Sequence, residues 1–282
     1  MVKYMEMNDN LKNFIESNID VIDHNRFDKL YVRANLNFLA PNLTELFLEV
    51  GIDPLKYLTE VPDNYMKHFK SLKQFPSLHS GIKEIGVGSF AFSSLVNVEI
   101  PSSIEYVHNG AFFNCKDLKT LIIHDGTLSV DSDTCSDCYN LSLVQLADSI
   151  QRLGEGCFSS CFNLKEIVIP HNLVTIEERC FEKSGLESII VPGNIIEIES
   201  RAFFNCSNLT SVILEEGVEI IKRNAFEKCN QLKHIKLPTS LHDIDDICFP
   251  QKLSKDTIFY IPKNNKKLSD YMIKHKYTYQ ES

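Results

Sequence analysis

The stretch IPSSIEYVHNGAFFNCKDLKTL, residues 100–121, spans one complete repeat of this chain. The leucine that it carries at position 118 recurs along the chain at intervals of 22 or 23 residues. The recurring leucines are Leu95, Leu118, Leu141, Leu164, Leu186, Leu209 and Leu232. A fixed period of this length is typical of a solenoid, in which each repeat buries its apolar side chains only by stacking on its neighbours.

The residues around each phased leucine predict the path of one coil. Two apolar, mostly β-branched residues follow it at a spacing of two, such as Val98 and Ile100, and this alternation predicts a short strand with one side facing inward. A proline such as Pro101 often ends the strand, since it has no N–H to donate. Further on, an aromatic row closes the coil at Phe90, Phe112, Phe158, Phe181, Phe203, Phe226 and Phe249.

This pattern closely resembles the BspA-like leucine-rich repeat family of the Treponema pallidum type. The resemblance implies a curved solenoid used for protein–protein or host-surface recognition, with no enzymatic activity. We therefore predict a leucine-rich-repeat right-handed solenoid with one short parallel strand per coil. The repeats are expected to occupy residues 71–262 in about eight coils of 22–24 residues.

Both ends of a solenoid need a cap, because the apolar core would otherwise meet water. We expect residues 1–70 to form a helical N-terminal capping region, with one short helix starting at Pro62. The stretch LFLEVGIDPLKYLTEVPDNYM, residues 46–66, also resembles the helical lead-in of bacteriophage-encoded leucine-rich proteins. At the other end, apolar residues at helical spacing predict a helix over 268–277 within a C-terminal cap, residues 263–282.

Composition narrows the choice of partners. The net charge is −9, and residues 72–250 carry 24 acidic against 14 basic side chains. An acidic array repels phosphate backbones, so we expect no nucleic-acid partner, and no apolar run is long enough to predict a membrane span. The first residues lack the apolar run of a secretory signal, which predicts a cytoplasmic protein. The sequence leaves the oligomeric state open, and a monomer is favoured. The alternative location is the cell surface or the medium, reached by a route that needs no signal peptide.

Several polar or thiol groups are candidates for a metal, redox or catalytic site. Cys135-Ser-Asp-Cys138 has the spacing of half a zinc site or a redox pair, but both residues sit at repeat positions, which favours packing. The nine cysteines are therefore predicted to be reduced and buried. Asp20, Asp23, His24 and Asp28 are interpreted as solvated surface. No catalytic residue, metal or cofactor is predicted. Cys135 replaces the row phenylalanine, so we expect the coil at 124–138 to be loose.

The candidate binding surface is the outward row between the two inward positions of each strand. Its apolar members would lie side by side on a stacked sheet and, with their polar neighbours, mark a protein-binding site. The predicted site comprises Ile122, Val168, Ile190, Ile213 and Tyr260, flanked by Glu166, Glu187 and His234. The leading hypothesis is a non-enzymatic scaffold that binds a protein through this face. The alternatives are a surface adhesin of the same fold, and an effector whose module in residues 1–70 is targeted by the repeats.

Overall fold

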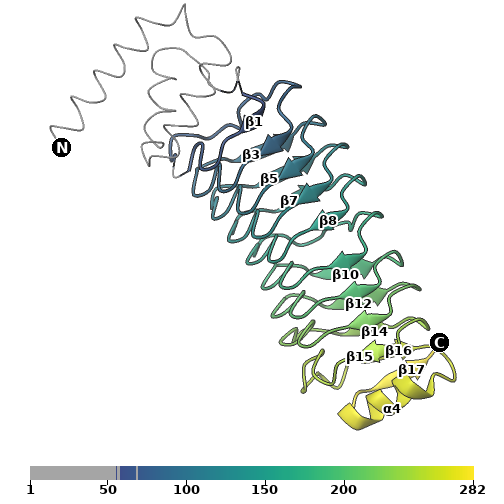
Figure 1. Ribbon diagram of the computed structural model, residues 1–282. Coiled ribbons are helices and arrows are strands. Elements are labelled where there is room, and N and C mark those ends of the chain that lie inside the picture. The colour runs from purple at the N-terminus through teal and green to yellow at the C-terminus, as the bar shows by residue number, and fades with distance from the viewer. Residues whose placement is uncertain (1–54, 56–57, 68) are drawn as a thin grey trace, which may run out of the picture.

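The computed structural model describes residues 55, 58–67 and 69–282, which wind into an elongated solenoid of about ten coils (Figure 1). Successive coils follow one another in sequence order along the axis, so each coil contacts mainly the coil before and the coil after it. The predicted parallel-strand repeat solenoid is confirmed, with about two more coils than expected.

One side of the solenoid is lined by parallel strands of three or four residues, most of whose side chains alternate between the outside and the core. They are β3 (Asn97–Ile100), β5 (Thr120–Ile123), β7 (Leu143–Gln145), β10 (Ser188–Val191), β12 (Ser211–Leu214), β14 (His234–Lys236), β16 (Ile258–Ile261) and β17 (Tyr279–Glu281). We call their outward surface the strand face. The strands from β3 to β14 follow phased leucines, as predicted, whereas Leu164 is followed by no strand and two further strands lie beyond the last phased leucine.

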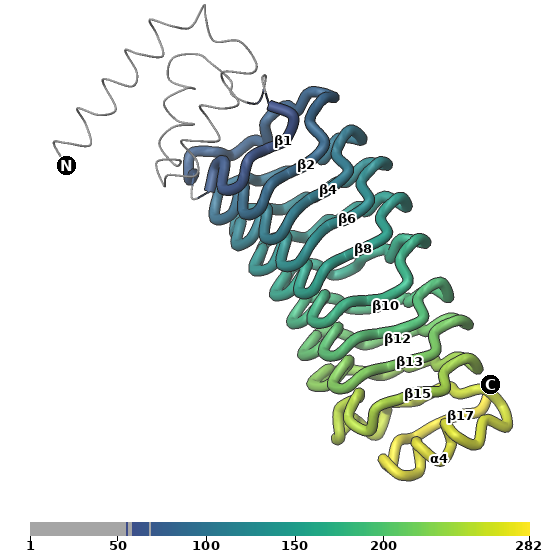
Figure 2. Tube along the Cα trace, viewed as in Figure 1, coloured from purple at the N-terminus to yellow at the C-terminus, as the bar shows by residue number. Residues whose placement is uncertain are grey.

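A second side carries short strands of two residues each, which the prediction of one strand per coil missed (Figure 2). They are β1 (Glu60–Val61), β2 (Glu84–Ile85), β4 (Tyr106–Val107), β6 (Ser129–Val130), β8 (Arg152–Leu153), β9 (Thr175–Ile176), β11 (Glu197–Ile198), β13 (Ile220–Ile221) and β15 (Asp243–Ile244). Two residues are too few for a period-2 pattern, so only the pairing of neighbouring coils reveals these strands. We call this side the short-strand side.

Each side holds two separate ladders instead of one. The strand face divides into β3-β5-β7 and β10-β12-β14-β16-β17, and the short-strand side into β1-β2-β4-β6-β8 and β9-β11-β13-β15. The short-strand side is interrupted between β8 and β9, at the junction between the coil of residues 141–163 and the coil that begins at Leu164. The strand face is interrupted at the same junction and also at the next one, because segment 165–169 forms no strand and belongs to no ladder with β7 or β10.

The third side, which we call the phenylalanine side, closes the core with stacked rings and thiols. Ring centroids from Phe181 to Phe249 follow each other at 5.0–5.3 Å with nearly parallel planes. All nine cysteines are buried free thiols, as predicted. They also do more than fill space: Cys115 Sγ donates to Phe90 O at 3.1 Å, and Cys229 Sγ to Phe203 O at 3.0 Å. The thiol row thus satisfies carbonyl groups of the preceding coil.

The ends differ in part from the prediction. β1 pairs with β2 in register, so the solenoid begins before residue 71, and residues 63–67 form turns where a short helix was expected. The rest of the predicted N-terminal helices, and the group of acids and histidine at 20–28, lie outside the described residues. At the C-terminal end, helix α4 (Lys266–His275) confirms the predicted closing helix, and β17 then adds one more strand after it.

The coil at 124–138 is not loose. Its strands β5 and β6 pair with the coils on both sides, β5 with β3 and β7 and β6 with β4 and β8. Cys135, which replaces the row phenylalanine there, is fully buried. Pairing of the backbones there does not depend on the missing phenylalanine ring. The junction at which the ladders stop lies one coil further on, after β7 and β8.

Candidate functional site: the strand face

Two isoleucines form the centre of the strand face. Burial alternates along β10 and β12, so Ile190 and Ile213 point outward while their neighbours enter the core. The two residues are direct partners in the parallel register of these strands. Ile190 is 55% exposed, and Ile213 is half-buried beside it. They form a continuous apolar surface, as the sequence predicted.

Val168 extends this surface but does not belong to the same ladder. It is 78% exposed and precedes Ile190 by one coil, in segment 165–169, which forms no strand. The expectation that it lies in one stacked sheet with the isoleucines is therefore wrong. Leu143 of β7 lies one coil earlier still and is 43% exposed. The sequence did not predict it, because Leu143 occupies the first outward position of its strand and the predicted row contains only the second outward positions. We define the apolar patch as Leu143, Val168, Ile190 and Ile213.

Charged side chains border the apolar patch. Glu166 and Glu187 are exposed on two successive coils. Lys165 Nζ lies 2.8 Å from Glu187 Oε1, and this hydrogen bond raises the pKa of Lys165. A polar rim around an apolar centre is the usual arrangement of a protein-binding surface.

A small pocket lies at the C-terminal end of the face. It measures about 350 Å³ and lies beside Ile213, where Tyr260 and His234 contribute two of its walls. The rings of His234 and Tyr260 approach to 6.3 Å between centroids. Its complete lining is Ser211, Val212, Ile213, His234, Lys236, Tyr260 and Ser282. The pocket joins three residues that the sequence placed in the site, and it is large enough for one anchoring side chain.

Ile122 stands apart from the rest of the predicted site. Its register partner on the next coil is Gln145, which separates it from the apolar patch. It instead lines a broad recess of about 810 Å³ at the N-terminal end of the face. There His124 Nε2 lies 2.7 Å from Glu99 Oε1, so this recess is polar in character.

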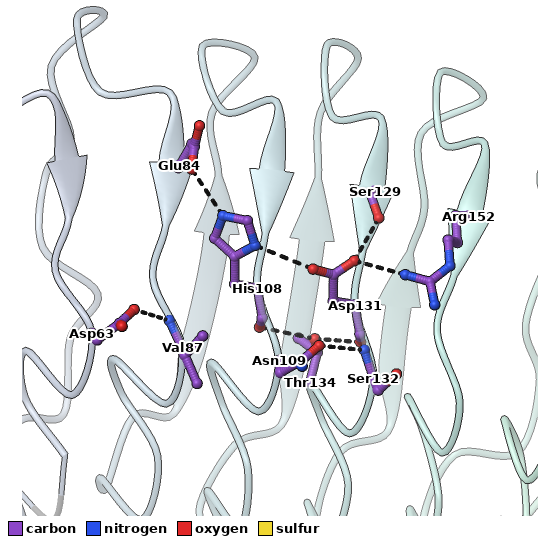
Figure 3. Close-up of polar contacts among 10 residues, drawn as sticks. All are labelled: Asp63, Glu84, Val87, His108, Asn109, Ser129, Asp131, Ser132, Thr134 and Arg152. Carbon is purple, nitrogen blue, oxygen red and sulfur yellow. Dashed lines mark hydrogen bonds and ion pairs between the residues drawn. The ribbon is translucent and has the colours of Figure 1, made fainter.

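A row of polar side chains on the short-strand side was missed by sequence reasoning (Figure 3). Both imidazole nitrogens of His108 face carboxylates, with Nε2 2.9 Å from Glu84 Oε2 and Nδ1 3.2 Å from Asp131 Oδ2. Asp131 Oδ1 in turn accepts from Arg152 at 3.0 Å and from Ser129 Oγ at 2.8 Å. His108 and Asp131 are 23 residues apart, the repeat length itself, so the repeat phase was the signal that reveals this pairing.

The two carboxylates decide the charge state of His108. Burial by itself would lower the pKa of His108, but the hydrogen bonds and charges of Glu84 and Asp131 outweigh it, and the pKa is raised above its usual value. The imidazole of His108 thus links three coils. The row joins side chains of successive coils, which is a structural role.

The cysteine pair at 135 and 138 has the surroundings of a packing group. The hydrogen bond with Cys138, followed by burial, raises the pKa of Cys135 well above its usual value, which keeps the thiol neutral. Across the described part of the chain, no group of three or more His, Cys, Asp or Glu side chains is arranged to hold a metal ion. The same residues include no helix with the length and apolar character needed to cross a membrane.

Comparison with known structures finds leucine-rich repeat proteins of bacteria. A leucine-rich repeat protein from Bacteroides ovatus is 21% identical, with 80% of this chain and 76% of that chain covered and a TM-score of 0.44. The leucine-rich repeat protein of T. pallidum is 21% identical, with 73% and 83% covered and a TM-score of 0.45. The pneumococcal vaccine antigen PcpA is 16% identical, with 80% and 77% covered and a TM-score of 0.46. Comparison with curated proteins finds no match.

The sequence profile of the BspA type leucine-rich repeat region matches this chain in six copies, over residues 54–164, 83–209 and 151–280. The matched range begins before residue 71, in agreement with the early start of the solenoid at β1. It also reaches past α4 to β17. Because these overlapping matches together span nearly all of the described coils, the chain belongs to the BspA-type leucine-rich repeat family.

Proposed function

We propose that this chain is a non-enzymatic scaffold that binds a partner protein through the strand face. One observation carries the proposal: the apolar patch exposes large side chains on successive coils, with Val168 at 78% and Ile190 at 55%. Isolated apolar side chains are normal on a protein surface, but contiguous ones within a polar border favour an interaction site. The repeat fold suits this role, because stacked coils present a long, extended surface.

The partner that fits this surface has apolar side chains in the middle of its contact area. It would cover the apolar patch and place one larger side chain in the pocket beside Tyr260. At the rim of that pocket, Lys236 favours a carboxylate on the partner. Few interface residues carry most of the binding energy, and those that fill such pockets are the usual anchors.

A test compares two sets of substitutions. In the first variant Val168→Ser, Ile190→Thr and Ile213→Thr replace three of the four side chains of the apolar patch. In the matched control Val174→Thr and Ile196→Thr alter similarly exposed apolar residues on the short-strand side. Proteins captured by immobilised wild type from the native source would be quantified by mass spectrometry. Each candidate would then be purified and retested against both variants.

We expect a partner that the control variant retains and the strand-face variant loses, with both variants as stable as the wild type in thermal unfolding. Equal retention by both variants would reject the strand face as the binding surface.

A cytoplasmic location is part of the proposal, and a surface adhesin is its alternative. The fold and the apolar patch are compatible with either role. One of the similar structures is a leucine rich cell surface protein from Faecalibacterium prausnitzii, which is 24% identical, with 73% of this chain and 71% of that chain covered and a TM-score of 0.37. Protease treatment of intact cells separates the two: an adhesin is digested, whereas a cytoplasmic scaffold is protected until the cells are broken.

A further inference from the structure

The junction between coil 141–163 and coil 164–185 lacks the backbone bonds that join other coils. At regular junctions an amide donates to a carbonyl one coil earlier, as from Gly154 to Val130 at 2.8 Å and from Glu199 to Ile176 at 2.9 Å. Among the described residues, no such bond links β7 to segment 165–169, and none links β8 to β9. The strand face and the short-strand side therefore both lack ladder pairing at this junction, near the middle of the solenoid between β8 and β10 (Figure 2). At the next junction the strand face also has no ladder, but Glu187 donates to Lys165 O at 2.9 Å and β9 pairs with β11.

The phenylalanine side of the same junction is fully bonded. Gly156 donates to Glu178 O at 2.9 Å, Phe158 to Cys180 O at 2.8 Å and Ser160 to Glu182 O at 2.7 Å. The backbones also meet closely there, since a Cβ at Gly185 would lie 1.9 Å from the carbonyl oxygen of Phe162. One side of the junction thus holds the two coils together while two sides do not.

One polar clasp crosses the junction at the corner between the two unpaired sides. The carboxylate of Asp148 lies 3.1 Å from His171 Nδ1 and accepts the backbone N–H of His171 at 3.3 Å. Asn172 Nδ2 donates to the carbonyl of Asp148 at 2.7 Å. The carboxylate and the imidazole are 70% and 72% exposed, so the clasp is made and broken in water at small cost.

We propose that the solenoid bends at this junction, with residues 58–163 and 164–282 moving as two blocks. The hydrogen-bonded phenylalanine side is the hinge, and the clasp at Asp148 is a weak latch. Two packed blocks joined along one edge are the usual elements of a hinge motion. Leu143 belongs to one block and Val168 and Ile190 to the other, so bending changes the shape of the apolar patch. That consequence for binding rests on the proposed function, whereas the bending itself does not.

Hydrogen exchange of the isolated protein, read by mass spectrometry, tests whether the junction lacks backbone bonds in solution, which the bending requires. Segment 165–169 has no ladder partner, whereas β12 is paired on both sides, so the amides of 166–169 should exchange at least about tenfold faster than those of 211–214. The amide of Phe158, on the hinge side, should remain slow. Exchange of 166–169 as slow as that of 211–214 would overturn the proposal.

A disulfide across the junction gives a second test. Gln145→Cys with Val168→Cys joins the blocks at equivalent positions of successive coils, and the control pair Ile190→Cys with Ile213→Cys joins two strands already in register. Coil spacing of about 5 Å suits a disulfide. If the blocks bend, oxidation should close the first pair and slow exchange of 166–169 toward the rate of 211–214, while the control disulfide leaves that segment fast.

Failure of the first pair to close, or closure without slower exchange, would count against the hinge. A lock that slows exchange but leaves partner capture the same in the oxidised and the reduced form of that variant would support the hinge and reject its link to the proposed binding face.

Discussion

At the scale of single residues, the row phenylalanines show what one missing ring does. Phe90 stacks on Phe112, and the stack resumes only from Phe158 to Phe181, with no ring contact between Phe112 and Phe158 among the described residues. Cys135 occupies the position between them. The ladders around it keep their ordinary pairing, so the backbones of these coils stay in the regular arrangement although a smaller side chain occupies the position of the ring.

Replacing Cys135 by Phe should therefore stabilise the protein. Filling such a site typically adds about 1 kcal/mol to the free energy of unfolding. Thermal unfolding would show it as a higher Tm. The matched control is Cys161→Phe, at a buried thiol position of the regular repeat, which should overpack the core and cost about 1–3 kcal/mol. A lower Tm for Cys135→Phe would show that the core has already closed around the thiol.

His108 predicts a pH dependence of stability. Its pKa is raised in the folded protein, so the folded state binds the proton more tightly than the unfolded chain does. The stabilisation is fully present below the unfolded pKa of about 6.5 and is lost as the pH rises through the folded-state value. Urea midpoints measured from pH 5.5 to 8.5 should thus fall for the wild type and fall less for His108→Gln. His234→Gln, on the strand face, serves as the control and should keep the wild-type slope.

At the scale of elements, the closing helix α4 explains a residue that interrupts the inward row. Asn265 follows Pro262 by three residues, a position that holds an apolar residue in earlier coils, such as Leu241. Its side chain accepts the N–H of Leu268 at 3.1 Å as the helix N-cap. The helix then lays Leu268 and Met272 over the last coil. The repeat ends because a helix starts, and the helix covers the apolar core that the next coil would otherwise cover.

The cap can be tested at two adjacent positions of α4. Met272 is fully buried, so Met272→Ala should cost about 2–5 kcal/mol of unfolding free energy. Ile273 points to solvent and is 63% exposed, so Ile273→Ala should change stability by no more than about 0.5 kcal/mol. Chemical denaturation of both variants measures the difference. Similar losses at the two positions would mean that helix propensity, and not coverage of the core, is what α4 contributes.

At the scale of the whole molecule, a solenoid is stabilised by contacts between neighbouring coils, so one weak junction divides it. We expect residues 58–163 and 164–282 to unfold in urea with separate midpoints when their exchange is followed by pulse labelling. Cys135→Phe should raise only the first midpoint, and Met272→Ala should lower only the second. A common shift of both midpoints by either substitution would show that the two halves unfold as one unit.

The sequence predicted much of the fold and less of the candidate site. The leucine at Leu118, the β-branched pair and the cysteine each recur at a fixed position of the coil. Because the same pattern returns in every coil, it specifies which residues stack on one another. Ile190 and Ile213 were placed correctly for the same reason, since outward positions follow from the strand register. Leu143 was missed because it lies in the first outward row, whose equivalent positions in the neighbouring coils are the polar residues Thr120 and Glu166, so the row has no apolar pattern.

The amino-acid sequence alone determined the coil, its inward rows and the path of the strands, because each depends on contacts that recur once per repeat. Only the tertiary structure decided the early start at β1, the charged link through His108, and the junction at which both ladders stop. These features depend on how one particular coil sits on the next. Small differences in the spacing and tilt of neighbouring coils make or break hydrogen bonds between them, while the pattern of residue types stays the same.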